Sequence, residues 1–111
     1  MSESVDKQWQ PVCKQEEIGR DIGVRALIGG EQVAIFNVKD DFFAVSAIDP
    51  FTNAAVLARG IVGDLQGKVV VASPIYKQHF NLKTGECLED ESVSIKTYAV
   101  RKNNGHIELA A

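Results

Sequence analysis

Short alternations of apolar and polar residues, separated by tight glycine turns, constrain this chain most strongly. Residues 24–28 and 31–38 are two such runs. Between them, Gly29-Gly30 supplies the positive φ angles of a two-residue β-hairpin turn. Asn104-Gly105 gives the same signal near the end of the chain. No stretch shows the pattern of a long amphipathic helix. The sequence therefore predicts an all-β fold with antiparallel neighbouring strands.

About nine short strands are expected, arranged as an antiparallel sandwich or barrel. Pro11 places the first strand at a sheet edge, because proline cannot donate to a hydrogen-bond ladder. Residues 53–59 favour a single helical turn that ends at Gly60, and the glycine-punctuated residues 61–67 carry no strand prediction. The expected strands are 9–13, 24–28, 31–38, 42–46, 68–73, 79–82, 86–88, 95–101 and 106–109.

Composition is that of a globular protein, with 45% hydrophobic and 24% charged residues among 111. We expect residues 8–111 to form one domain after a flexible lead, 1–7. The net charge of −3 gives no reason to expect nucleic acid or an anionic membrane as a partner. No apolar run approaches the roughly 20 residues of a membrane span. Because the first residues lack a secretory signal, we expect a cytoplasmic protein in which Cys13 and Cys87 are reduced, buried thiols.

Two short proline loops follow β-like runs, at residues 49–51 (Asp-Pro-Phe) and 73–76 (Ser-Pro-Ile-Tyr). The second is followed by a Phe-x-Leu-x-x-Gly hairpin at residues 80–85. This frame resembles the Rieske iron–sulfur domain, whose loops read Cys-Pro-His and Cys-Pro-x-His. The resemblance implies a Rieske-like fold with both loops at one end. The positions that correspond to cluster ligands are Asp49, Phe51, Ser73 and Tyr76.

The spacing of a Rieske centre is kept at these positions, but the donor atoms are not. A Rieske cluster needs two thiolates and two imidazoles. Phe51 has no donor atom, Ser73 is a poor iron ligand, and the oxygens of Asp49 and Tyr76 do not suit a sulfide cluster. We therefore expect no metal in this chain. A single metal ion on Asp49 and Tyr76 is a weaker alternative to the ordinary role of Asp49, which is to cap the turn before proline.

No other catalytic constellation emerges from the sequence. The remaining cysteines and histidines lack metal-ligand spacing. Ser73 has no nucleophile elbow around it, so a pairing with His79 would be a weak signal. The acidic run formed by Glu86, Glu89, Asp90 and Glu91 reads as a solvated loop rather than an acid/base pair.

Among Rieske-like chains that lack the ligands, this one resembles the small subunit of the assimilatory NAD(P)H-dependent nitrite reductase. The resemblance covers roughly residues 9–109. It implies a hetero-oligomer with a large subunit that carries FAD, a [4Fe–4S] cluster and siroheme and reduces nitrite to ammonia in nitrate assimilation. The small chain would hold no cofactor and would belong to an oxidoreductase without being a catalyst by itself. The segments that carry the resemblance are 30–36, 48–51, 56–60, 71–74 and 87–91.

The loop end suggests two roles that the sequence leaves open. Exposed loop aromatics are typical interface anchors, which favours docking to a partner. Alternatively, Phe51 and Tyr76 fold inward and fill the space of the lost cluster. Two other functions stay open: an independent β-barrel interaction module with no redox role, and a ferredoxin with unconventional ligands. The candidate docking residues are Phe51, Ile75, Tyr76, Lys77 and Gln78.

Overall fold

The computed structural model describes residues 9–20, 22–75 and 77–110. Regular structure in these ranges consists of nine strands and two 3₁₀ turns, which confirms the all-β prediction. The flexible lead expected at residues 1–7 lies outside the described residues. The elements are β1 (Trp9–Lys14), η2 (Gln15–Glu17), β2 (Gly23–Ile28), β3 (Glu31–Val38), β4 (Asp41–Ser46), η3 (Leu57–Arg59), β5 (Ile61–Leu65), β6 (Lys68–Ala72), β7 (His79–Asn81), β8 (Thr97–Asn103) and β9 (His106–Ala110).

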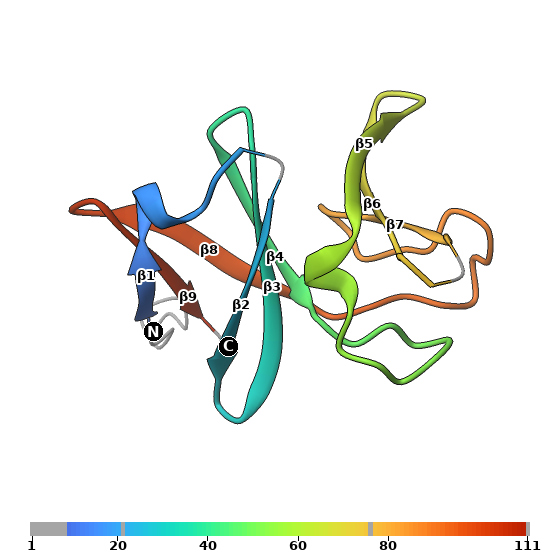
Figure 1. The fold of residues 1–111 in the computed structure, drawn as a ribbon, viewed down its shortest axis with the longest axis horizontal. Helices are drawn as coiled ribbons and strands as arrows, with labels where there is room; N and C mark the ends of the chain where they lie inside the picture. Colours follow the sequence, from blue (N-terminus) through green and yellow to red (C-terminus); the bar gives the residue numbers. More distant parts are fainter. Residues whose placement is uncertain (1–8, 21, 76, 111) are drawn as a thin grey trace, which may run out of the picture.

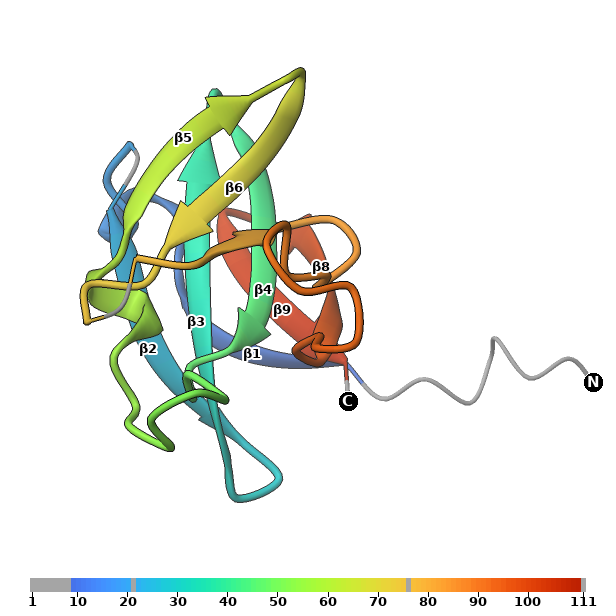
Figure 2. The same ribbon diagram turned by 90° about the vertical axis from the view of Figure 1, so that its right-hand side faces the viewer.

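The strands form two antiparallel sheets (Figure 1). The larger sheet has the order β1-β9-β8-β4-β3-β2, and its edge strands β1 and β2 contact each other, so that the sheet nearly closes into a barrel. The smaller sheet, β5-β6-β7, lies in front of the larger one in Figure 2. The first strand is an edge strand, as Pro11 predicts, and its register shifts between Pro11 and Cys13.

Strand β3 separates two hydrophobic cores because both of its faces are buried. Successive side chains of a strand point to opposite faces. Val33 and Ile35 therefore enter the core of the larger sheet, whereas Ala34 and Phe36 enter the core between the two sheets. The second core also contains Leu57, Val71, Phe80, Leu82, Cys87 and Ile95, so it joins η3, the small sheet and the loops to the barrel.

Two strand predictions were wrong. Residues 61–65 form β5, which pairs with β6 through the turn Gln66-Gly67, where both φ angles are positive. Its glycines hide the strand signal, and tertiary pairing overrides weak local propensity. Residues 86–88 form only isolated bridges to Phe80 and Ser94. The single helical turn predicted within residues 53–59 is η3, which ends at Gly60 as expected.

The turn η3 is held between strands by two glycines that admit close backbone contact. A Cβ on Gly23 would lie 2.2 Å from the carbonyl oxygen of Ala58. A Cβ on Gly60 would lie 2.4 Å from the carbonyl oxygen of Ala72. The turn therefore packs directly on the beginning of β2 and the end of β6. None of the helical segments in the described ranges is long and apolar enough to cross a membrane.

Substitution of Gly23 by alanine should destabilise the protein by about 2 kcal/mol or more, because backbone must move to relieve the overlap. The matched control is Gly63→Ala in β5, where an added Cβ meets nothing within 4 Å. The control should change stability by less than about 0.5 kcal/mol. Urea unfolding measures both, and equal effects of the two substitutions would contradict the close packing of η3.

Candidate functional site

Two loops make up the candidate site. The first loop (residues 47–52) follows β4, and the second loop (residues 73–78) connects β6 to β7. In Figure 2 both lie toward the left-hand side, with the second loop above the first. The segment that follows the first loop folds back on the start of that loop, because the backbone N–H of Leu57 donates to the carbonyl of Ala47 at 3.0 Å. A buried hydrogen bond joins the two loops.

Asp49 is the fully buried centre of the first loop. Its Oδ1 accepts a hydrogen bond from the Phe51 backbone N–H at 2.9 Å. Its Oδ2 accepts one from the Ser73 hydroxyl at 2.5 Å. Both oxygens thus have partners, which offsets the cost of burying the carboxyl group. The first of these bonds confirms the predicted capping of the turn around Pro50.

Ser73 closes the second loop in a similar way and is only 1% exposed. Its hydroxyl accepts a hydrogen bond from the Ile75 N–H at 3.3 Å while it donates to Asp49. Its own N–H donates to the Gln78 carbonyl at 2.9 Å, and its carbonyl accepts from the Lys77 N–H at 3.0 Å. In each loop a polar side chain before proline therefore accepts from the N–H two residues later.

The remaining candidate residues divide between core and surface. Phe51 is half-buried and packs on the core between the sheets, with its ring centroid 6.3 Å from that of Phe80. Phe51 thus lies inward, in agreement with the alternative in which it folds into the protein. Ile75 and Lys77 are exposed. Gln78 is half-buried, and its Oε1 has no hydrogen-bond partner within the described part of the chain. Tyr76 lies outside the described residues.

The described ligand positions do not fit a [2Fe–2S] cluster. Phe51 offers no donor atom, and the oxygens of Asp49 and Ser73 bind each other and the loop N–H groups. Rieske clusters are held by cysteine and histidine. In residues 9–20, 22–75 and 77–110, no group of three His, Cys, Asp or Glu side chains could hold a metal ion. The loops thus carry hydrogen bonds where a Rieske domain carries ligands.

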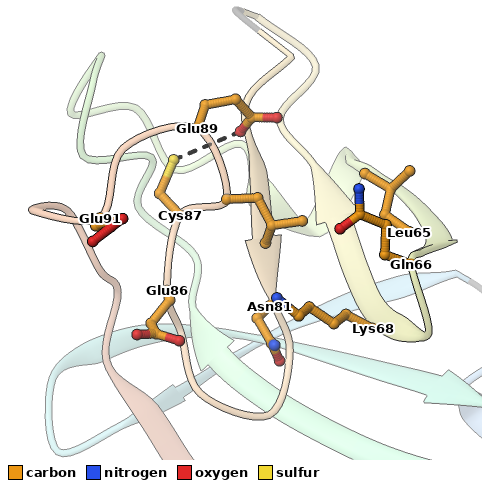
Figure 3. Close-up of a pocket in the computed structure, with 9 residues that line it drawn as sticks. Leu65, Gln66, Lys68, Asn81, Glu86, Cys87, Glu89 and Glu91 are labelled. Atoms are coloured by element: carbon orange, nitrogen blue, oxygen red, sulfur yellow. Dashed lines mark hydrogen bonds between the residues drawn. The ribbon is translucent and has the colours of Figure 1, made fainter.

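A separate pocket of about 570 Å³ lies beside the acidic run (Figure 3). Glu86, Glu89 and Glu91 are exposed at its rim, as expected for a solvated loop. Burial acts to raise the pKa of Glu89, but hydrogen bonds from the backbone N–H and ring of His79 outweigh it and hold that pKa below its usual value. Glu89 is thus a structural partner of β7. The pocket is lined by Leu65, Gln66, Lys68, Asn81, Glu86, Cys87, Leu88, Glu89 and Glu91.

The two thiols are not joined in the structure. Cys87 is buried, as predicted, whereas Cys13 is only partly buried, so the prediction was wrong for Cys13. The edge position of β1 accounts for this exposure. Burial raises the pKa of both thiols, which lowers the thiolate fraction at neutral pH.

Thiol titration with Ellman's reagent checks this assignment. In the native protein Cys13 should react slowly and Cys87 more slowly still, because Cys87 is only 2% exposed. Unfolding without reductant should release both thiols at once. The Cys13→Ser variant identifies the faster phase. Failure to detect thiols in the unfolded, unreduced protein would contradict the assignment.

A double-mutant cycle measures the bond between the loops. Asp49→Ala leaves the N–H of Phe51 and the hydroxyl of Ser73 without an acceptor, so it should cost about 2–3 kcal/mol of stability. Ser73→Ala should cost about 1–2 kcal/mol, and the coupling energy should be about 1 kcal/mol or more. The control pair is Asp90→Ala with Ser92→Ala, which removes an exposed hydrogen bond of the same type at 2.6 Å.

The control pair should couple by less than about 0.5 kcal/mol, because water replaces an exposed bond readily. Chemical denaturation of the four proteins in each cycle supplies the free energies. A buried pair that couples no more strongly than the exposed pair would contradict a joining role for Asp49 and Ser73.

Comparisons with known proteins agree with this geometry. Residues 8–110 match the family model of the Rieske-like [2Fe-2S] domain. The nitrite reductase (NADH) small subunit of Salmonella typhimurium is 50% identical over 104 residues, which are 92% of this chain and 96% of that one. The NMR structure of the Escherichia coli protein NirD aligns with a TM-score of 0.88 at 46% identity, covering 95% of this chain and 97% of that one.

A relative of different architecture also matches. The nitrite reductase [NAD(P)H] large subunit of Klebsiella oxytoca is 32% identical over 101 residues. These are 91% of this chain but 11% of that one, so the domain occurs there as a small part of a long polypeptide. Together with the near-complete matches to small subunits, this likeness shows that the chain belongs to the Rieske-like family of nitrite reductase small subunits.

Proposed function

We propose that this chain is a cofactor-free small subunit of an NAD(P)H-dependent nitrite reductase and supports a separate catalytic chain. The observation that carries the proposal is the bond between Asp49 and Ser73. It occupies two of the positions that a Rieske domain uses for ligands, and Phe51 stands at a third. A domain so built offers a rigid surface rather than a redox centre.

The identity of the proposed partner is inferred from the domain arrangement of the related proteins. In the Klebsiella oxytoca large subunit the same domain belongs to the long polypeptide, whereas in Salmonella typhimurium it is a separate small subunit. A domain that occurs both within a large subunit and beside one is expected to contact that large subunit in either case. The proposed complex is therefore a hetero-oligomer of this chain with a nitrite reductase large subunit.

In this complex the redox chemistry belongs to the large subunit. There, FAD, a [4Fe–4S] cluster and siroheme would pass electrons from NAD(P)H to nitrite and form ammonia for nitrate assimilation in the cytoplasm. This chain would stabilise that subunit or assist its assembly. We propose the second loop as part of the contact, through the exposed Ile75 and Lys77 and the half-buried Gln78, with Phe51 supporting the loops from within.

Co-expression of this chain with its large subunit tests the proposal. A tag on this chain should recover the large subunit as a stable complex, and the complex should reduce nitrite with NAD(P)H faster, or survive heating longer, than the large subunit alone. The large subunit alone is the control. If the activity and heat stability of the large subunit did not change, and the tag recovered a non-redox partner instead, the chain would be an independent interaction module.

A further inference from the structure

Three exposed isoleucines lie on adjacent segments around η3. Ile22 is 60% exposed, Ile61 is 75% exposed and Ile75 is 45% exposed. We propose that these residues form a docking face, here called the isoleucine face, for an apolar patch with an acidic rim on the nitrite reductase large subunit. This inference rests on the proposed function and adds the surface and the chemistry of its partner.

Backbone contacts link the segments that carry the three residues. Ile22 directly precedes Gly23, which packs against the carbonyl of Ala58 in η3. Ile61 begins β5 two residues after η3 ends, and it pairs with Ala72 at the end of β6. Ile75 follows Ala72 by three residues. In Figures 1 and 2 the beginning of β5 lies between the beginning of β2 and the second loop.

The fold itself does not require isoleucine at these surface positions. Val62, next to Ile61, packs on the core between the sheets, so Ile61 points the other way along the alternating strand. A polar β-branched residue would serve β5 equally well. Single exposed apolar side chains are common, but several on neighbouring segments indicate an interaction surface. Within the described ranges, the other large exposed apolar residues are Leu27 and Leu65, which lie at the far ends of β2 and β5.

Each isoleucine of the face has a cationic residue two positions away in the sequence. Arg20, Arg59 and Lys77 are exposed, and within the described residues none of their side chains has an ion pair or a hydrogen bond. Three exposed cations next to the isoleucines favour an acidic rim on the partner, because opposite charges across an interface steer and orient docking.

The related proteins favour the large subunit as the partner that covers the isoleucine face. In the Klebsiella oxytoca protein this domain is tethered to the rest of the large subunit, so an interface between the two is available within one chain. In the separate small subunit the same interface must be strong enough to assemble without a tether. A compact apolar centre with complementary charges provides that affinity and the register of docking.

Binding of the purified, cofactor-loaded large subunit to variants of the full chain tests the apolar centre. The triple variant Ile22→Ser/Ile61→Thr/Ile75→Ser should raise the Kd by about tenfold or more, because buried apolar anchors dominate binding. The matched control is Leu27→Ser, which removes a side chain that is 64% exposed on β2 but outside the isoleucine face. The control should bind like the wild type. Circular dichroism verifies that each variant is folded.

A second pair of variants tests the charges. Arg20→Glu/Arg59→Glu should slow association by about tenfold and weaken its dependence on salt, because repulsion replaces steering. Lys83→Glu reverses an exposed charge on the hairpin after β7 and should have a much smaller effect.

The outcomes separate this inference from the proposed function. If the wild-type chain does not bind the large subunit, both fail. If the wild type binds and the triple variant binds equally well, the isoleucine face is wrong and the subunit assignment stands. A third outcome is that the wild-type chain self-associates, the triple variant does not, and both bind the large subunit equally well. That result would assign the face to a second copy of the chain and would also overturn the inference.

Discussion

The buried bond from the Ser73 hydroxyl to the Asp49 carboxyl holds the two loops of this domain together. One loop follows a strand of the larger sheet and the other follows a strand of the smaller sheet, so the bond also links the two sheets at their loop end. In a Rieske domain iron performs that linkage. In this chain, hydrogen bonds link the loops: the side chains of Asp49 and Ser73 bind each other and the loop N–H groups. Phe51 packs beneath them on Phe80.

The proposed exchange of a metal for hydrogen bonds would let a redox fold serve a structural role. A hydrogen-bonded pair contributes only about 1–3 kcal/mol, but it needs no cluster assembly and leaves the loops fixed. In our proposal the fixed second loop and the beginnings of β2 and β5 form one apolar and basic docking face. In this account electrons travel through the large subunit, and this chain contributes shape, charge and rigidity.

Local turn chemistry made much of the fold predictable. Gly29-Gly30 and Asn104-Gly105 adopt the positive φ angles that their types favour, and their hairpins appear as expected. Strand β5 was missed because an exposed edge strand depends on its neighbour more than on its own sequence. The ligand spacing located the loops, yet only the structure shows that Asp49 bonds to Ser73. The isoleucine face unites residues that are distant in sequence, so no local pattern could reveal it.

The most direct test of the central claim is the metal content and chelator dependence of the purified chain. We expect a colourless protein with far less than one iron or zinc per chain and an unfolding transition that a strong chelator does not shift. Stoichiometric metal, or a chelator-induced loss of stability that added metal restores, would show that a metal joins the loops. Either result would contradict the role given to Asp49 and Ser73.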